Sequence, residues 1–386
     1  MLALLTLIQT GMSGLQFALI ALLPVVKADL GVGVARTAVL ASAVSAGALL
    51  AAVPAGQVAT RFGERRTLVG GGLLAGTAML VAATLSNTWL MLVPLLVVGL
   101  GVVTSHPAGV RLIMRGFGPR ERGGAISIRQ TAVPLGGVLT ALALPPIAEA
   151  AGWRAAIVVA ALTVLALAGL ARALLPPDEG QTRTVAPGAR MGALLRNRGV
   201  MAAVALSFVF NIAQVAGVTF IALWAHDSLD RSVTLGAVLL ALVQASGIVG
   251  RILWGITSDR LHHGRRKPLL YAISAGALAS FLLLAVFGRA TPVALLVGAA
   301  LLVGFTAVAW NGLTIALATE AAGLAGAATA MSFIVVVVSF VNTAVPIAGG
   351  LVIDATGSYR TLWLASAAIL LLAPVLTAMT REGEIA

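Results

Sequence analysis

Long apolar stretches recur along the whole chain, separated by short polar breaks, and they constrain the fold more than any other feature. Each is about 18 residues or longer, which is enough for a helix to cross a hydrocarbon core of about 30 Å. The stretches are too long for the strands of about ten residues in an outer-membrane barrel. The sequence therefore predicts an all-α membrane protein with twelve transmembrane helices. The expected spans are 3–25, 37–58, 67–85, 90–113, 124–145, 154–174, 199–224, 234–256, 268–287, 293–317, 325–348 and 361–379.

The composition agrees with lipid as the main solvent of the chain. Hydrophobic residues make up 60% of it and charged residues 10%, and the mean hydropathy is +1.04. The first apolar run, from Leu2 to Val26, has neither a basic segment before it nor a small-residue cleavage site, so we expect a span rather than a signal peptide. The absence of cysteine excludes disulfides and thiolate metal sites, and it fits a bacterial inner membrane.

The distribution of positive charge predicts the orientation. With the N-terminus inside, the cytoplasmic segments carry 16 Lys and Arg, the outer segments carry six, and three lie within spans. By the positive-inside rule, this asymmetry places both termini in the cytoplasm. The net charge of +12 is thus explained by topology, and we expect no nucleic-acid partner.

The longest polar break divides six spans from six. It runs from about Leu175 to Gly199 and holds three prolines and several charged residues. We therefore expect an N-terminal six-helix bundle at 1–174, a cytoplasmic linker at 175–198 and a C-terminal six-helix bundle at 199–386.

The two halves repeat each other at an offset near 200 residues. The break after span two reads GQVATRFGERR from Gly56, and the break after span eight reads GITSDRLHHGRR from Gly255. A second pair of similar loops begins at Gly152 and Gly357, before spans six and twelve. Repeated halves of this kind are how many secondary transporters build a site between them.

These loops resemble the signature of the major facilitator superfamily, which has the form G-x-x-x-D-R-x-G-R-R between spans two and three. The resemblance covers essentially the whole chain and implies two pseudo-symmetric six-helix bundles. It also implies a cytoplasmic gate in which acid and arginine side chains tie the halves together. Thr60 and Glu64 depart from the pattern, which weakens the first-half gate. The expected gate residues are Gly56, Arg61, Arg65, Gly255, Asp259, Arg260, Arg265 and Arg266.

Two arginines, Arg129 and Arg251, lie within spans five and eight. Each is about six residues, or roughly 9 Å, to the cytoplasmic side of the middle of its span. Spans five and eight meet across the halves in the fold that the resemblance implies, so an anion between these two positive charges would be attracted. The alternative is that each side chain snorkels to the headgroups or pairs with Glu121 or Asp259.

Other polar side chains are candidates to orient such a ligand. The stretch from Gly250 to Asp259 resembles span eight of facilitators for monocarboxylates, oxalate and cyanate-like anions, in which an arginine is the substrate's charge partner. Each further candidate has the alternative of a helix-packing hydrogen bond. These candidates are Gln16, Gln130, Asn211, Gln214, Gln244, Trp310 and Asn311.

Two residues of span four have competing interpretations. His106, followed by Pro107, is a candidate for proton coupling, and the alternative is a packed histidine bonded to a freed carbonyl. Arg111, one turn from Arg115, is expected to snorkel.

The sequence predicts a transporter and not an enzyme, because it holds no metal cluster, phosphate-cradling loop or catalytic triad. We expect a monomer without a cofactor, which moves a small anion by alternating access, as proton-coupled uptake or anion exchange. The alternatives are proton-driven multidrug efflux and a membrane sensor or scaffold that does not transport.

Overall fold

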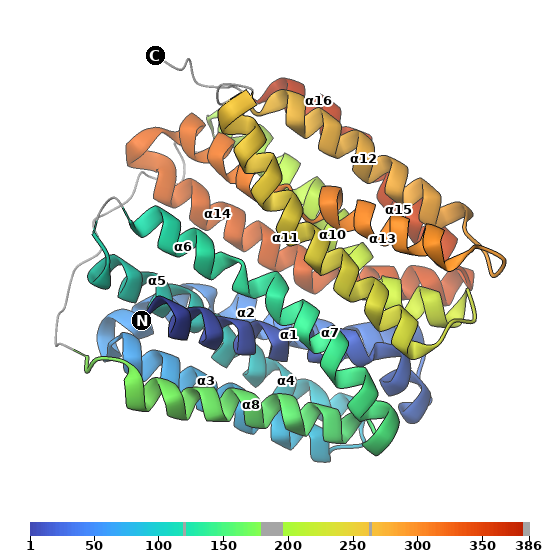
Figure 1. Ribbon diagram of the computed structural model, residues 1–386, viewed down its shortest axis with the longest axis horizontal. Helices are drawn as coiled ribbons and strands as arrows, with labels where there is room; N and C mark the ends of the chain where they lie inside the picture. Colours follow the sequence, from blue (N-terminus) through green and yellow to red (C-terminus); the bar gives the residue numbers. More distant parts are fainter. Residues whose placement is uncertain (119–120, 179–195, 262–264, 381–386) are drawn as a thin grey trace. The chain divides into compact units, whose positions relative to one another are not determined.

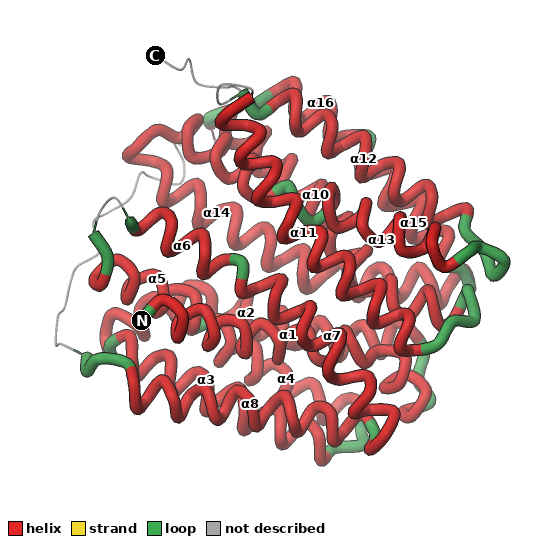
Figure 2. Tube along the Cα trace, in the orientation of Figure 1, coloured by secondary structure: helices red, strands yellow, loops and turns green. Residues whose placement is uncertain are grey.

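The computed structural model describes residues 1–118, 121–178, 196–261 and 265–380, and all regular structure in these ranges is helical (Figure 2). Among them, twelve helices are long and apolar enough to cross a membrane. The prediction of a twelve-span, all-α membrane protein is confirmed. Most of the predicted linker lies outside the described residues.

The described helices form two compact units (Figure 1). The first contains α1 to α8 together with Val233–Ala241, the first part of α11. The helices of the first six spans are α1 (Leu2–Leu30), α2 (Val34–Phe62), α3 (Glu64–Thr84), α4 (Thr88–Val103), α5 (Ser105–Gly116), α6 (Arg122–Gln130), α7 (Ala132–Ala151) and α8 (Trp153–Leu174).

The second unit contains α10, the rest of α11 and all the later helices. Its helix α14 joins two spans, which meet at Gly323, where a φ of 66° interrupts the helical backbone. The helices of the last six spans are α10 (Arg198–Asp227), α11 (Val233–Leu261), α12 (Lys267–Val286), α13 (Val293–Ala307), α14 (Asn311–Thr356), α15 (Tyr359–Leu370) and α16 (Leu372–Met379).

Small residues let helices of the first unit pack backbone against backbone. A Cβ atom built on Gly47 of α2 would collide with the carbonyl of Leu96, and one built on Gly99 of α4 would collide with the carbonyl of Val44. In lipid, where no hydrophobic effect drives helices together, such close contact is a main source of helix association.

The repeated loops that begin at Gly152 and Gly357 have the same structural role in each unit. In the first unit, Trp153 Nε1 at the start of α8 donates to Asp29 Oδ2 at the end of α1, over 2.8 Å. In the second, Tyr359 Oη at the start of α15 donates to Asp227 Oδ2 at the end of α10, over 2.6 Å. Each loop therefore ties the last span of its unit to the first.

Breaks interrupt several spans and position the site described below. The regular hydrogen bonding of span four is interrupted at Thr104, between α4 and α5, and that of span ten at residues 308–310, between α13 and α14. Thr104, Val308 and Trp310 keep right-handed helical dihedral angles, so each of these breaks is a local irregularity in a helix that continues. Backbone carbonyls that lose their intrahelical donor at such a place need another hydrogen-bond donor.

Candidate functional site

Arg129 of α6 is buried inside the first unit, with only 2% of the residue exposed. Its Nη2 donates to Oε1 of Gln9 on α1, over 2.6 Å. The same nitrogen donates to the backbone carbonyl of Ser105, the first residue after the break in span four. The guanidinium therefore joins three helices from inside the unit and does not snorkel.

The neighbouring residues are shaped to hold the guanidinium. A Cβ atom on Gly109, one turn beyond Ser105, would contact the guanidinium directly, so only glycine leaves room for it. The Ser105 hydroxyl lies 3.0 Å from Gln9 Oε1 and 2.8 Å from the carbonyl of Val102. Gln9 Nε2 donates to the Ser13 hydroxyl over 3.1 Å, which fixes the orientation of the Gln9 amide.

The partners of Arg129 are uncharged. In the part of the chain that the structure describes, no carboxylate forms an ion pair with its guanidinium, and its buried Nε has no hydrogen-bond partner. Glu121, one of the two predicted partners, lies 3.4 Å from the amide of Gly118 through its Oε2. A buried cation costs free energy unless it is paired, so this site is electrostatically suited to an anion.

His106 follows Ser105 on α5 and is half-buried. It lies next in the chain to the residue whose carbonyl accepts from Arg129. The structure thus places the predicted proton-coupling residue and the predicted charge partner at the same break in span four.

The second predicted arginine, Arg251 of α11, has a related environment in the second unit. Its Nε donates over 3.2 Å to the carbonyl of Val308, the residue that follows α13. Trp254 Nε1, one turn further, donates over 2.8 Å to the carbonyl of Phe305. Gln244, two turns before Arg251, is 2% exposed, and its Nε2 has no hydrogen-bond partner among the described residues.

Each arginine thus binds a backbone carbonyl at a break in a membrane helix. Arg129 binds the carbonyl of Ser105 after the break in span four, and Arg251 binds that of Val308 at the break in span ten. The separation of the two breaks is close to the repeat offset of the sequence. The sequence analysis did not predict these contacts. Pro107, three residues after Thr104, was a signal for the break in span four.

Three of the predicted orienting residues form one polar and aromatic group in the second unit. Trp310 Nε1 donates over 2.9 Å to Gln214 Oε1, and the Trp310 ring stacks on Phe210 with centroids 6.1 Å apart. Asn211 Nδ2 donates to the Val338 carbonyl over 3.1 Å.

Amide oxygens in this region are left without partners. Asn211 Nδ2 lies 3.2 Å from Oδ1 of Asn342, a residue that sequence reasoning did not single out. The Oδ1 atoms of Asn211 and Asn311 are buried without hydrogen-bond partners among the described residues. Of the remaining candidates, Gln16 is half-buried on α1 and Gln130 is exposed at the end of α6.

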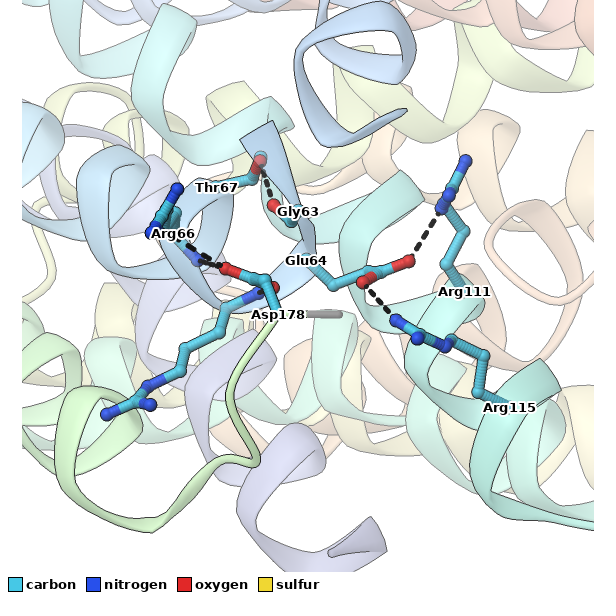
Figure 3. A network of polar contacts seen from close by, with 8 residues as sticks. Gly63, Glu64, Arg66, Thr67, Arg111, Arg115 and Asp178 are labelled. Carbon is cyan, nitrogen blue, oxygen red and sulfur yellow. Dashed lines mark hydrogen bonds and ion pairs between the residues drawn. The ribbon is translucent and has the colours of Figure 1, made fainter. Parts of the chain in front are cut away.

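The loop after span two forms a charged network at the start of α3 (Figure 3). Glu64, only 2% exposed, accepts from Arg111 Nε over 2.9 Å and from Arg115 Nη1 over 2.8 Å. Arg111, whose side chain is expected to snorkel, thus pairs with the carboxylate of the first residue of α3, beside the loop after span two. Glu64, a departure from the signature, is therefore the acid that anchors span three to span four.

The backbone of the same loop is capped by a residue from the end of the first unit. Asp178 accepts from the amide of Arg65 over 2.7 Å and from the amide of Arg66 over 3.0 Å (Figure 3). The side chain of Arg65 donates to the carbonyl of Arg172. The predicted gate residue Arg65 thus contacts the end of α8 within its own unit.

The corresponding loop of the second unit also forms an ion pair, but here the loop supplies the arginine and the neighbouring span supplies the acid. Arg266, at the start of α12, pairs with Glu320 of α14. Arg61, Arg260 and Arg265 are exposed, and Gly255 lies in α11. Gly56 lies in α2 and Asp259 in α11, and the surroundings of both residues are outside the described part of the structure.

Comparison with known proteins identifies related sequences along most of the chain. A model described as the Major Facilitator Superfamily matches residues 2–342. An uncharacterized MFS-type transporter of Mycobacterium tuberculosis is 31% identical over 305 residues, which are 78% of this chain and 67% of that protein. A fujikurins efflux protein of Gibberella fujikuroi is 23% identical over 80% of this chain and 65% of its own length. A probable sulfoacetate transporter of Cupriavidus necator is 23% identical over 90% of this chain and 85% of its own length.

A solved structure shares the fold. The crystal structure of a bacterial homolog of the human lysosomal transporter Spinster, in an inward-facing and occupied conformation, superposes with a TM-score of 0.82 at 16% identity. The match covers 98% of this chain and 95% of that one.

Proposed function

Because this chain belongs to the Major Facilitator Superfamily, and is therefore a multi-pass membrane transporter and not an enzyme, we propose that its substrate is a small organic anion. Transport by alternating access would bring the anion to Arg129, the principal charge partner. This proposal goes further than the family alone, whose members carry many classes of substrate.

The observation that carries the proposal is the unpaired state of Arg129. Its guanidinium is buried, its bonded partners are the neutral Gln9 and a backbone carbonyl, and its Nε is without a partner in the described part of the chain. A carboxylate or sulfonate oxygen would supply both the missing acceptor and the missing negative charge. A cationic substrate would add repulsion to a site that already holds a buried positive charge.

Features of the second unit support an anion with one charged end and one polar end. Arg251 supplies a second cationic group beside the break in span ten. The unpartnered Oδ1 atoms of Asn211 and Asn311 would accept hydrogen bonds from a substrate hydroxyl or amide. We propose that Gln214, Gln244 and Trp310 orient the substrate with them.

The name of one relative agrees with this substrate class. The probable sulfoacetate transporter is matched over nearly the whole chain, and sulfoacetate is an organic anion. At 23% identity, the name supports the chemical class and not the individual compound.

The coupling and the orientation follow from the same account. We propose that a proton enters with the anion, carried by His106 or by the substrate's own acidic group, or that one anion exchanges for another. We propose a bacterial plasma membrane as the location of the protein, and the positive-inside rule favours both termini in the cytoplasm. We propose that the protein acts as a monomer.

Uptake into liposomes tests the proposal. Purified protein should take up labelled small anions, with sulfoacetate and short monocarboxylates tried first. Arg129→Gln should reduce uptake at least about tenfold, since breaking one side of a buried charge interaction costs about 2–5 kcal/mol. Arg360→Gln is the matched control, because Arg360 is an exposed cation at the start of α15. Full anion uptake by folded Arg129→Gln protein would refute the role of Arg129.

Efflux of hydrophobic compounds is the second candidate, and the match to the fujikurins efflux protein favours it. It predicts that cells without the protein become sensitive to such compounds, and that Arg129→Gln leaves their export unchanged. Anion transport predicts neither result.

A further inference from the structure

The first unit contains a cavity of about 520 Å³ that is separate from the Arg129 site. It lies between α2, α3 and the end of α4, and its volume is in the range of about 300–1,000 Å³ that is usual for small-ligand pockets. Its walls include Leu50, Pro54, Val58, Leu74 and Leu100.

The walls of the cavity are apolar, because the hydroxyl groups that line it already donate hydrogen bonds to backbone carbonyls. Thr67 Oγ1 donates to the Gly63 carbonyl over 2.6 Å, and Thr104 Oγ1 donates to the Gly101 carbonyl over 2.7 Å. On α3, a Cβ atom built on Gly70 meets nothing within 4 Å, so the cavity reaches the helix backbone at this point. An extended apolar chain fits these walls better than a compact polar solute.

One end of the cavity is cationic. Arg66, in the first turn of α3, lines it, and the Arg66 side chain is 79% exposed. Among the described residues, Asp178 pairs with Arg66, and its Oδ2 lies 4.0 Å from Arg66 Nε. The two carboxylate oxygens of Asp178 also accept from the backbone amides of Arg65 and Arg66 (Figure 3). The guanidinium therefore keeps most of its surface for a further partner.

We propose that this cavity binds an anionic phospholipid, with one acyl chain between α2, α3 and α4 and the phosphate on Arg66. The positive charge of Arg66 favours an anionic lipid over a neutral one. By the positive-inside rule, this end of α3 lies at the cytoplasmic surface, where anionic headgroups attract arginine and lysine. A neutral lipid would fill the apolar walls equally well but would add no negative charge to the single, 4.0 Å contact that Arg66 Nε makes with Asp178.

The position of the cavity gives the lipid a structural role. Thr104, the residue at the break in span four, lines the cavity, and Ser105, the next residue, binds Arg129 through its carbonyl. A bound acyl chain would therefore contact span four at the residue next to the one that Arg129 binds. Lipid binding should accordingly raise the thermal stability of the protein.

The test titrates the delipidated full-length protein in detergent with palmitoyl-oleoyl phosphatidylglycerol or phosphatidylcholine and counts bound lipids by native mass spectrometry. We expect one phosphatidylglycerol to bind more tightly than any phosphatidylcholine. Arg66→Gln should weaken phosphatidylglycerol about fivefold, the effect of one basic residue at an anionic surface, and leave phosphatidylcholine unchanged.

A second variant tests the cavity itself. Gly70→Leu fills the open space on α3 and should weaken both lipids. Gly169→Leu is the matched control, since Gly169 of α8 also has open space around it and lies outside the cavity. Equal binding of the two lipids, or unchanged phosphatidylglycerol binding in Arg66→Gln and Gly70→Leu, would overturn the proposal. So would a shift in the KM of transport in Arg66→Gln with lipid binding unchanged, which would assign the cavity to the transported solute.

Discussion

The guanidinium of Arg129 binds the backbone carbonyl of Ser105, the residue with which span four resumes after its break at Thr104. This contact links a buried positive charge, which has no carboxylate partner among the described residues, to an irregularity in a membrane helix. An anion that binds Arg129 would compete with the carbonyl for the same nitrogen. Substrate binding would then change the hydrogen bonding at a break in a membrane helix, which is a local event that a transport cycle is able to use.

Gly109→Ala tests the space on which this contact depends. The added Cβ atom would contact the Arg129 guanidinium, so the arginine or α5 must move. We expect a loss of about 1–3 kcal/mol of stability from overpacking, together with weaker anion binding. Thermal unfolding and ligand titration measure the two effects. Gly169→Ala, with open space around it, should leave the protein as stable or up to about 1 kcal/mol more stable.

Gln9→Glu supplies the missing negative charge from the protein itself. Gln9 Oε1 lies 2.6 Å from Arg129 Nη2, so a carboxylate there would neutralise the guanidinium. We expect anion transport to fall at least about tenfold while the protein remains folded, because the site no longer needs a counter-ion. Asn87→Asp, at an exposed position where Asp caps α4 as well as Asn does, should transport normally. Normal transport by Gln9→Glu would argue against a direct anion contact.

Glu64→Gln tests the charged network at the start of α3. The buried carboxylate accepts from both Arg111 and Arg115, so its removal should cost about 1.5–3 kcal/mol. Because the second unit holds an ion pair of exchanged sign, Arg266 with Glu320, the double variant Glu64→Arg with Arg115→Glu should recover part of the loss. Thermal unfolding of the three proteins gives the comparison. A single variant as stable as the parent would mean that the two ion pairs of Glu64 add no net stability.

Tyr359→Phe removes the tie between the first and last spans of the second unit. The Tyr359 hydroxyl donates to Asp227 over 2.6 Å, and its loss should cost about 0.5–1.5 kcal/mol. The only other tyrosine, Tyr271, is 40% exposed on α12, and Tyr271→Phe should change stability by less than about 0.5 kcal/mol. Equal effects of the two substitutions on the unfolding temperature would contradict the assigned role of the Asp227 contact.

The fold was predictable because lipid leaves a chain few choices. Apolar runs of sufficient length must be helices, and the twelve expected spans correspond to twelve helices of the structure. Repeated loops such as those at Gly152 and Gly357 indicated two halves, and the structure gives them matching contacts at Asp29 and Asp227.

The contacts of the site were harder to predict, because they depend on neighbours distant in sequence. Arg129 was identifiable as an intramembrane charge, but its partners Gln9 and Ser105 are 120 and 24 residues away. The acid that pairs with Arg111 was missed for the same reason, since Glu64 is 47 residues away and stands where the family signature has an arginine. A helix break is also a weak sequence signal, because several prolines lie inside helices without ending them, namely Pro24, Pro54, Pro94, Pro145, Pro146 and Pro346.

Calorimetric titration of the purified protein with small anions tests the central claim most directly. We expect at least one carboxylate or sulfonate to bind, and its dissociation constant to rise at least about tenfold in Arg129→Gln but not in Arg360→Gln. Thermal unfolding of each variant confirms that the protein titrated is folded. If hydrophobic compounds bind and anions do not, or if anions bind Arg129→Gln as tightly as the parent, Arg129 is not the charge partner of the substrate.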